Sequence, residues 1–145
     1  MKIMLDEGAI MPTRAHPYDA GLDLYTPCAI TVRGSVSACF YVTVGSVTID
    51  TGVHVEIPEG CVGFIKSKSG LNVKHGLTAE GVIDAHYTGS IAVKLYNHTP
   101  YPHHFAAGDK IAQLVILKCE LPELELVDSL DETDRGDNGF GSTGR

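Results

Sequence analysis

The sequence predicts a single all-β domain of the sandwich, jelly-roll or barrel type. Some short runs alternate apolar and polar residues, others are rich in β-branched and aromatic residues, and 16 glycines and 7 prolines separate them. A chain of 145 residues has the usual size of one domain and needs no disulfide or metal to stabilise its core. Many short strands with frequent turns are typical of these three architectures.

Five runs are predicted as strands, because they alternate with period two or because their residues favour extended backbone. They are Thr31-Val32, Cys39 to Val44, Ser46 to Ile49, Val53 to Ile57 and Ile91 to Leu95. Turns are predicted at 33–34, 58–60 and 107–109. A helix of one or two turns is predicted after Ser69, through Leu71 to Lys74. His103 and His104 are predicted to lie in a polar loop rather than to bind a metal.

The acidic residues are concentrated at the end of the chain. The formal net charge is −7, but residues 1–119 hold 10 acidic and 9 basic side chains, whereas residues 120–145 hold 8 and 2. A chain without a basic excess is not expected to bind nucleic acid generally or a membrane surface. Within one domain, the pattern predicts a nearly neutral β-strand core over 1–119, an acidic connector over 120–134 and a glycine-rich arm over 135–145.

A cytoplasmic location is expected. The first residues lack the basic and apolar pattern of a secretory signal, and no apolar run reaches the roughly 18–20 residues of a membrane span. The four cysteines form no Cys-x-x-Cys pair. They are therefore expected to be reduced thiols rather than zinc ligands.

Residues 135–145 have the composition of an arm that binds phosphates and a base. Glycines allow consecutive backbone N–H groups to point at one anion, and the hydroxyls of Ser142 and Thr143 add donors. Arg135 adds a positive charge, and the ring of Phe140 offers a flat face for stacking. From composition alone, a flexible tail without this role is the alternative.

Two acidic residues of the body are candidates for chemistry. Asp84 follows two apolar residues at the predicted end of a strand, where a carboxylate can be a general base, a metal ligand or a turn cap. Asp23 lies between Leu22 and Leu24, so its side chain faces away from theirs and needs water or a partner. Magnesium, directly or through its waters, is one such partner.

Two polar features interrupt the apolar pattern of the body. The segment 66–70, Lys-Ser-Lys-Ser-Gly, combines cations and hydroxyls before the predicted helix, as a phosphate site does, and a solvated basic turn is the alternative. Gln113 interrupts the apolar run 111–117, so its amide requires a hydrogen-bond partner if it is buried. That partner is either a neighbouring backbone group or a substrate.

Five stretches, in their order along the chain, resemble the five motifs of the trimeric dUTP pyrophosphatase (dUTPase) family. They are Ala20-Gly-Leu-Asp23-Leu, Gly63-Phe-Ile-Lys-Ser-Lys-Ser-Gly-Leu71, Gly81-Val-Ile-Asp84-Ala-His-Tyr87-Thr-Gly89, Gly108-Asp-Lys-Ile-Ala-Gln113-Leu and Arg135-Gly-Asp-Asn-Gly-Phe140-Gly-Ser-Thr-Gly144. The resemblance extends from residue 12 to the end of the chain. The third and fifth stretches are the most specific.

The resemblance implies a jelly-roll-like distorted β-barrel (β-clip) with one short helix and a flexible C-terminal arm. It implies a homotrimer in which three chains share each active site, with the arm supplied by a different chain from the core pocket. The implied reaction is hydrolysis of dUTP to dUMP and pyrophosphate with Mg²⁺. This reaction limits uracil in DNA and supplies dUMP for dTMP synthesis.

The resemblance also implies roles for individual residues. Asp84 is the implied base that deprotonates the water attacking the α-phosphorus, and Gln113 holds that water or the α-phosphate. Asp23 is implied to hold Mg²⁺ through water. Tyr87 is implied to pack under the deoxyribose and exclude ribonucleotides, and Phe140 to stack on uracil. The other implied substrate-binding residues are Lys68, Ser69, Gly70, Thr78, Gly81, Val82, Ile83, Arg135, Gly141, Ser142 and Thr143.

Several positions depart from the family pattern. Lys68 stands where the second motif commonly has Arg, so the charge is kept but the bidentate fork is lost. Thr78 stands where the third motif often has Asn, and Asn138 stands where the fifth often has Gly. Residues 34–48 are longer than a hairpin needs. Since some dUTPases of mobile genetic elements bind repressors, this segment is a candidate surface for a regulatory protein.

Two other functions fit the sequence less well. The dCTP deaminases share the fold, but they carry a catalytic Glu ten positions after the shared Asp, where this chain has Lys94. The tripeptide 135–137, Arg-Gly-Asp, is the integrin-binding sequence, but it lies within the fifth motif of a chain without a secretory signal. Hydrolysis of dUTP is therefore the expected activity.

Overall fold

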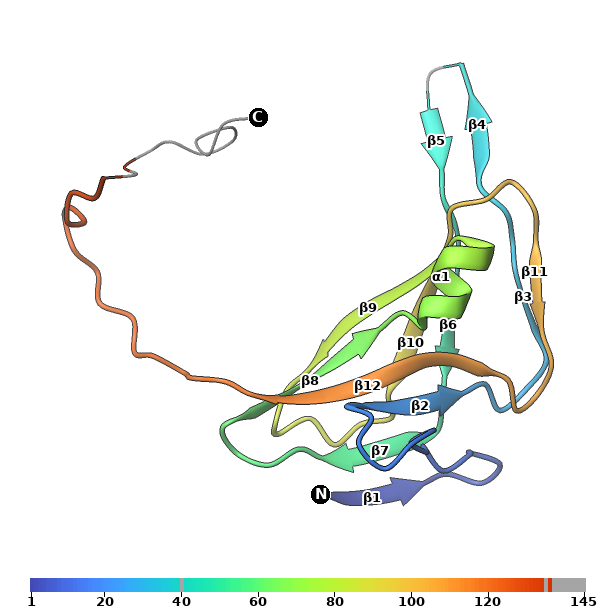
Figure 1. Ribbon diagram of the computed structural model, residues 1–145, viewed down its shortest axis with the longest axis horizontal. Helices are drawn as coiled ribbons and strands as arrows, with labels where there is room; N and C mark the ends of the chain where they lie inside the picture. The colour runs from blue at the N-terminus through green and yellow to red at the C-terminus, as the bar shows by residue number, and fades with distance from the viewer. Residues whose placement is uncertain (40, 135, 137–145) are drawn as a thin grey trace.

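The computed structural model describes residues 1–39, 41–134 and 136. Antiparallel strands and one short helix form this part of the chain (Figure 1). The strands are β1 (Lys2–Leu5), β2 (Gly21–Tyr25), β3 (Ile30–Val32), β4 (Val36–Ala38), β5 (Tyr41–Thr43), β6 (Gly45–Asp50), β7 (Val53–Glu56), β8 (Cys61–Lys66), β9 (Leu77–Ile83), β10 (Ala92–Asn97), β11 (His103–Phe105) and β12 (Lys110–Lys118). The helix is α1 (Ser69–His75).

A curled six-stranded sheet forms the body, with the strand order β2-β12-β8-β9-β10-β6 (Figure 1). The pairs β1-β7, β11-β3 and β4-β5 complete the strand pairing of the described residues. All of these neighbours run antiparallel. The expected all-β fold of the jelly-roll type with one short helix is confirmed.

The inward-facing residues of alternating strands form the core. In β10, Val93 and Leu95 are buried, whereas Lys94 and Tyr96 are exposed. Burying one such aliphatic side chain stabilises the fold by roughly 1.5–3 kcal/mol. The largest fully buried aliphatic side chains are Leu24, Ile65, Leu77, Ile91, Leu95, Ile111 and Leu114. Several of them neighbour the candidate site residues in sequence, so the core fixes the strands that carry the site.

Two of the predicted local structures are corrected. The predicted strand over Cys39 to Val44 is instead part of a hairpin, because the chain turns at Cys39 between β4 and β5. This hairpin projects from the body (Figure 1), and Tyr41 and Val42 are more than 60% exposed. His103 and His104 lie in β11 rather than in a loop, since β11 pairs with β3 and His104 Nδ1 lies 2.8 Å from Thr31 Oγ1.

The predicted helix is confirmed as α1, between β8 and β9. It ends at Gly76, whose φ of 61° is the left-handed conformation that commonly terminates helices. The Gly76 N–H donates to Asn72 O at 2.9 Å. Leu71 is the half-buried residue through which the helix packs against the core. The turn before α1 therefore has a fixed position beside the sheet.

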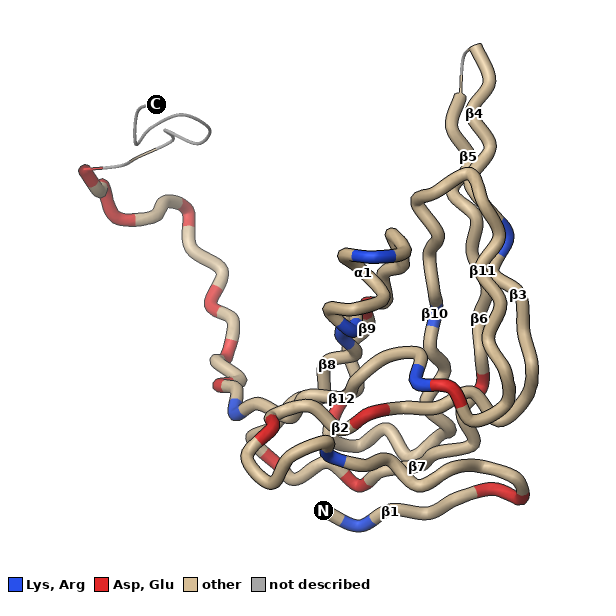
Figure 2. Tube along the Cα trace, turned by 45° about the vertical axis from the view of Figure 1, so that its right-hand side comes forward, with Lys and Arg blue, Asp and Glu red and all other residues tan. Residues whose placement is uncertain are grey.

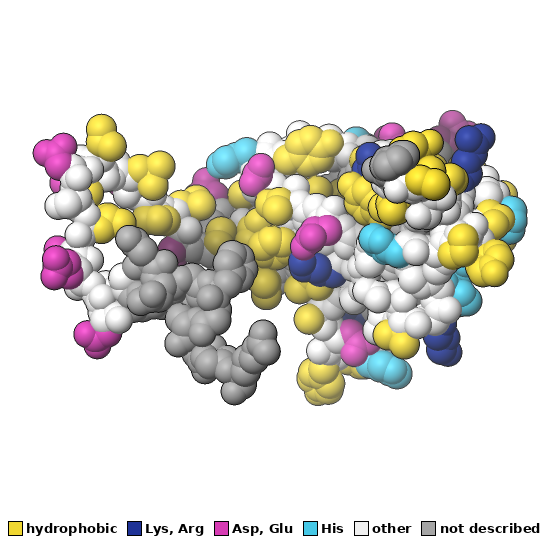
Figure 3. All heavy atoms as spheres, turned by 90° about the horizontal axis from the view of Figure 1, so that it is seen from above, with side chains coloured by type: hydrophobic (Ala, Val, Ile, Leu, Met, Phe, Trp, Pro, Cys, Tyr) yellow, Lys and Arg dark blue, Asp and Glu magenta, His cyan; other side chains and the backbone are white. Residues whose placement is uncertain are grey.

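The chain leaves the body after β12. Residues 120–134 form no helix or strand and extend outward (Figure 1). Acidic residues are spread along this segment (Figure 2), and hydrophobic side chains stand between them (Figure 3). Four leucines are at least 83% exposed, namely Leu121, Leu124, Leu126 and Leu130. Over the described residues, the structure has no helix of the length and apolar character that a membrane crossing requires.

Candidate active site

Strand register brings Asp23 and Gln113 together. Asp23 in β2 is directly opposite Gln113 in β12, and Gln113 is opposite Lys66 in β8. Residues directly opposite one another in antiparallel strands project from the same face, so the carboxylate and the amide lie side by side. Ser67 and Lys68 form the turn after β8, directly following Lys66 and so next to Gln113. Parts of three of the matching sequence stretches therefore meet in one place.

Two lysines neutralise the Asp23 carboxylate, which is only 6% exposed. Lys68 Nζ contacts Oδ1, and Lys110 Nζ lies 2.7 Å from Oδ2. Burial raises the pKa of Asp23, but hydrogen bonds from Lys110 and Lys68 outweigh it and hold that pKa below its usual value. The hydrogen bond to Asp23 raises the pKa of Lys110. The partner that the sequence required for Asp23 is therefore a pair of cations.

Gln113 also has a defined partner. Its Nε2 donates to the backbone oxygen of Ser67 at 3.0 Å. The Ser67 hydroxyl accepts a hydrogen bond from the Ala79 N–H at 2.9 Å, which ties the turn to β9. A Cβ added at Gly21 would lie 2.1 Å from Gln113 Oε1, so only glycine allows the amide to approach β2 this closely. The predicted requirement for a hydrogen-bond partner is confirmed, and in this structure that partner is a backbone carbonyl.

A cavity of about 360 Å³ lies at this meeting point. Its lining residues are Ala15, Asp19, Ala20, Gly21, Asp23, Lys68, Gln113 and Val115. Ser69 and Gly70, which begin α1, directly follow Lys68 and are exposed. The cations, the amide and the hydroxyl can donate hydrogen bonds to phosphate groups, and the carboxylates can accept them from the waters of a hydrated metal ion. Among the described residues, no three His, Cys, Asp or Glu side chains gather as a metal site.

Lys110 is the site residue that the sequence reasoning missed. It opens β12 and stands in the fourth stretch, three positions before Gln113. A basic residue at the start of a strand is ordinarily a solvated charge, so spacing alone did not indicate its contact with Asp23. Its position opposite Tyr25, close to Asp23 in the paired strand, explains the contact.

Asp84 lies apart from this cavity. It follows β9, is exposed, and lines a separate cavity of about 610 Å³ together with Ala85, Cys61 and Cys119. Ile83 in β9 pairs with a residue of β8 that in turn pairs with Ile116 in β12, and Ile116 lies three residues after Gln113. Strand β8 separates β9 from β12. From the spacings of a sheet, Asp84 and Gln113 are roughly 15 Å apart. The two predicted catalytic residues are not brought together within one chain.

The hairpin of β9 and β10 opens next to Asp84. The pairing of β9 with β10 ends at Ala79 and Leu95, whereas residues 81–83 pair with β8 on their other side. Gly81 and Val82 are at least partly exposed, while the Ile83 side chain is buried in the core. In the described chain, this edge of β9 therefore presents main-chain donors and acceptors that β10 does not pair.

Two other predicted substrate contacts lie on this hairpin. Tyr87 belongs to the loop after Asp84, where its N–H donates to Asp84 O at 3.0 Å and its hydroxyl donates to Ser90 O at 2.9 Å. Tyr87 as a whole is 45% exposed. Thr78 lies in β9, and its Oγ1 is 2.7 Å from His98 Nε2. The Thr78 hydroxyl is thus bonded to the residue that follows β10.

The predicted arm falls largely outside the described part of the chain. Arg135, Phe140, Gly141, Ser142 and Thr143 all lie outside the described residues. Their roles stay predictions from the sequence.

Comparison with known proteins identifies the family. A family model of dUTPases matches residues 7–144. Deoxyuridine 5'-triphosphate nucleotidohydrolases from Corynebacterium efficiens and Arabidopsis thaliana are 42% and 43% identical to the chain, over 99% and 97% of its length and 76% and 80% of theirs.

Solved structures agree with this assignment. Staphylococcus bacteriophage 80alpha dUTPase with dUpNHpp is 29% identical, with a TM-score of 0.85 over 99% of this chain and 98% of that chain. A mutant dUTPase from phage phi11 of S. aureus, described with a structural Mg(II) ion, is 29% identical, with a TM-score of 0.76 over 88% of this chain and 96% of that chain.

The curled antiparallel sheet and these relatives together identify a jelly-roll enzyme that acts on a nucleotide. The chain belongs to the dUTPase family, and its activity is that of a dUTP diphosphatase. The resemblance seen in the five sequence stretches is confirmed.

Proposed function

We propose that the protein converts dUTP to dUMP and pyrophosphate by attack of an Asp84-activated water on the α-phosphorus. The open edge of β9 carries this proposal, because its main-chain groups at 81–83 lead directly to the exposed Asp84 carboxylate. Those groups bind the polar edge of uracil and leave no room for the methyl group of thymine. The exposed ring of Tyr87 packs against the deoxyribose and excludes a 2′-hydroxyl.

In the proposed reaction, Asp84 accepts a proton from the attacking water while the oxygen of that water bonds to the α-phosphorus. The bond from phosphorus to the bridging oxygen breaks, and pyrophosphate leaves in line with the attack. Gln113 orients the water or the α-phosphate, and the Ser69 hydroxyl donates to the bridging oxygen. Donors aimed at developing charge are typically worth about 3–4 kcal/mol each. Lys68 and Gly70 contact the phosphates from the same turn.

Mg²⁺ is part of the proposal, and Asp23 is the residue that holds it. Each Asp23 oxygen contacts a lysine, yet each keeps a second lone pair, so a contact through metal-bound water fits better than direct ligation. When bound, Mg²⁺ neutralises the triphosphate and favours one phosphate geometry. The structural Mg(II) of the phage phi11 relative supports a place for this ion in the family.

We further propose a homotrimer with shared active sites. Two observations support it: Asp84 and Gln113 are far apart within a chain, and residues 120–134 carry leucines that the chain's own core does not cover. A neighbouring subunit that covers this connector buries those leucines. The arm, 135–145, then reaches a site on another subunit, where Arg135, Ser142 and Thr143 bind phosphates and Phe140, followed by Gly141, stacks on uracil.

Mixing two inactive variants tests the mechanism and the shared site together. Asp84→Asn and Gln113→Ala should each lower pyrophosphate release from dUTP by at least about 100-fold, since each removes a group that acts on the reacting atoms. Trimers refolded from an equal mixture should regain about a quarter of wild-type activity, because each site then draws the two residues from different chains.

The control for mixing is the variant that carries both substitutions, which should restore nothing when it is mixed with either single variant. Single variants that stay active would refute the assigned roles. Inactive singles that never complement would instead show that both residues serve one site from one chain.

The proposed cellular role is to limit uracil in DNA and to supply dUMP for dTMP synthesis in the cytoplasm. The free thiols Cys28, Cys39, Cys61 and Cys119 support this location, because reducing compartments keep cysteines unpaired.

A second function, binding of a regulatory protein, is proposed for the hairpin of β4 and β5. The hairpin projects from the body with Val36, Tyr41 and Val42 exposed, and it contributes no residue to either cavity described above. Exposed apolar side chains of this kind are typical of binding surfaces. Among the similar structures, phage 80alpha dUTPase is described as controlling transfer of virulence genes.

A further inference from the structure

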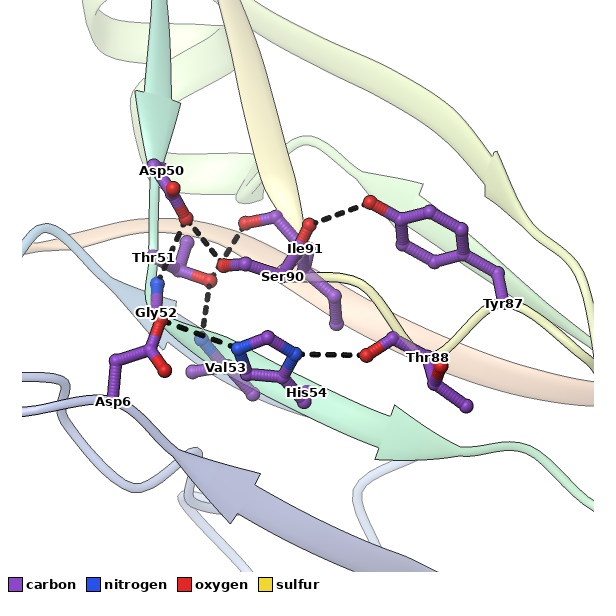
Figure 4. Close-up of polar contacts among 10 residues, drawn as sticks. All are labelled: Asp6, Asp50, Thr51, Gly52, Val53, His54, Tyr87, Thr88, Ser90 and Ile91. Atoms are coloured by element: carbon purple, nitrogen blue, oxygen red, sulfur yellow. Dashed lines mark hydrogen bonds and ion pairs between the residues drawn. The ribbon is translucent and has the colours of Figure 1, made fainter.

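The loop that carries Asp84 and Tyr87 is held from the side of β7 by His54. The imidazole Nδ1 lies 2.8 Å from Thr88 O, and Nε2 lies 3.2 Å from Asp6 Oδ2 (Figure 4). The His54 side chain is 18% exposed, so the ring is largely enclosed between the end of β1 and the loop. One side chain thus joins the N-terminal strand pair to the loop after β9.

The end of this loop is bonded to residues around the β6–β7 turn. The Ser90 hydroxyl donates to Asp50, and the Ile91 N–H donates to Val53 O at 2.8 Å. The Thr51 hydroxyl donates to Ile91 O at 2.7 Å (Figure 4). Because Tyr87 is bonded to Ser90, these contacts extend to the ring proposed to pack on the sugar. Within this network, His54 is the group that titrates near neutral pH.

The partners of His54 determine its protonation state. A backbone carbonyl such as Thr88 O can only accept a hydrogen bond, so Nδ1 must carry a proton. The Asp6 carboxylate likewise only accepts, so Nε2 must carry one too. Both contacts exist together only in the imidazolium form. A neutral imidazole has a single N–H, so either the Thr88 carbonyl or the Asp6 carboxylate then faces the unprotonated ring nitrogen and loses its hydrogen bond.

The charges around His54 favour this cation. Asp6 after β1 and Asp50 at the end of β6 are acidic. Lys2 and Glu56, the next charged pair on the same face of β1 and β7, neutralise one another at 2.9 Å. The loop itself contributes Asp84 and His86. Asp6 is fixed in place, because its N–H donates to Gly52 O at 2.9 Å.

We propose that His54, oriented by Asp6, is a positioning residue that holds the catalytic loop in its active arrangement only while it is protonated. The proposal rests on the roles proposed above for Asp84 and Tyr87. In this proposal, His54 does not contact the substrate and acts only through the carbonyl of Thr88. Catalysis of dUTP hydrolysis acquires a pH dependence from a group outside both cavities that Asp84 and Asp23 line.

The direction of this dependence follows from the contacts. The hydrogen bond to Thr88, and then that to Asp6, raise the pKa of His54 above its usual 6.5. Because the pKa is raised in the folded protein, the contacts of His54 with Thr88 and Asp6 are both complete below pH 6.5, and they are lost as the pH rises through the raised value. The loop should therefore loosen on the alkaline side.

The first test follows the imidazole and the loop in the free protein, without turnover. The imidazole carbon and nitrogen NMR shifts of His54, followed against pH, should give a pKa above 6.5, and Asp6→Asn should lower that pKa. Amide hydrogen exchange of 85–91, corrected for its intrinsic pH dependence, should accelerate as His54 loses its proton. In His54→Gln, whose amide does not titrate, that acceleration should be absent.

The second test measures kcat/KM for dUTP against pH. The wild type should lose activity by roughly three- to tenfold over the His54 titration, the scale of one lost hydrogen bond. His54→Gln should remove this step, whereas His104→Gln, a histidine of β11 outside the loop contacts, should retain it. Thermal unfolding separates a misfolded variant from one with a loosened loop.

The outcomes are distinct. A His54 that titrates at or below 6.5, a pH-independent loop exchange, or an unchanged step in His54→Gln each overturns the proposal. An Asp84→Asn variant of full activity refutes the proposed function instead, and it leaves the NMR and exchange results on His54 standing.

Discussion

Asp23 shows how a nearly buried carboxylate stays charged. Its two oxygens contact two different lysines, Lys68 from the turn after β8 and Lys110 from the start of β12. Loss of either cation leaves the other to neutralise the carboxylate, while loss of the carboxylate leaves two cations close together. The residue thus stabilises the junction of three strands in addition to its proposed role toward Mg²⁺.

Asp23→Asn should destabilise the protein at neutral pH but not in acid. The loss should be roughly 1–3 kcal/mol, the scale of hydrogen bonds to charged groups. Because the pKa of Asp23 is lowered, its contribution is full above the usual value of 3.8 and disappears as the pH falls through the lowered one. Urea unfolding of both proteins from neutral pH to about pH 3 measures the converging stabilities.

Glu80→Gln is the matched control for this experiment. It breaks the Lys66–Glu80 ion pair, 2.7 Å long but formed by side chains that are 47% and 77% exposed. Water and salt screen such exposed pairs, so this pair contributes little to stability. A loss in Asp23→Asn no larger than in the control would contradict the stabilising role given to the two lysines.

For single residues, the sequence predicted which polar groups require a hydrogen bond, but not which groups supply it. Leucines on both sides of Asp23 and the apolar run around Gln113 showed that each polar group required a hydrogen bond. They did not show that Lys110 and the carbonyl of Ser67 supply those bonds, because both contacts depend on the register of β12 against its neighbours.

Among the elements, the β4–β5 hairpin contributes no residue that is proposed to act in catalysis. Ser35 and Gly45 close its base, where the Ser35 hydroxyl lies 3.4 Å from the Gly45 nitrogen. The Ser35 N–H donates to Thr99 O at 2.7 Å, so the base is tied to the body independently of the tip. The tip can therefore be removed without opening the sheet.

Replacing residues 36–44 by two glycines should leave dUTP turnover within about twofold of the wild type, since none of the described side chains of this segment belongs to the core. The same change should abolish binding of any regulatory protein that docks on the exposed tyrosine and valines. Turnover assays and pull-down with a phage-type repressor, with wild-type protein as the reference, measure the two effects. Retained binding would place the regulatory surface elsewhere.

Strand prediction succeeded where burial and alternation coincide. Val53 and Val55 are buried and His54 is not, so the pattern in the sequence followed the pattern in space. The 39–44 region lacks such contrast, because all of its described side chains are exposed in a two-stranded hairpin. Apolar residues there predicted a strand but not the turn within it.

For the whole molecule, the separation of Asp84 from Gln113 is the feature that the five motifs did not reveal. Their order along the chain says nothing about which residues share a cavity, and sheet register places the two roughly 15 Å apart. The proposed trimer accounts for this distance, and it gives the connector, 120–134, a surface to cover its leucines.

Truncation after Asp134 should abolish turnover while the trimer persists, because it removes the arm but keeps the connector. Light scattering after size exclusion measures the assembly, and pyrophosphate release measures the activity. Within the full chain, Phe140→Ala should cost less activity than Arg135→Ala if closure over the phosphates outweighs stacking. A truncated chain with full activity would contradict the role of the arm.

The distance between Asp84 and Gln113 also bears on how the enzyme responds to its own dilution. In the proposed shared site, a single chain has no activity alone, so the rate per chain should fall once the protein is diluted below the dissociation constant of the proposed trimer. In a cell that makes little of the protein, each newly synthesised chain stays inactive until it assembles with other chains. Expression level would then set the activity more steeply than in proportion.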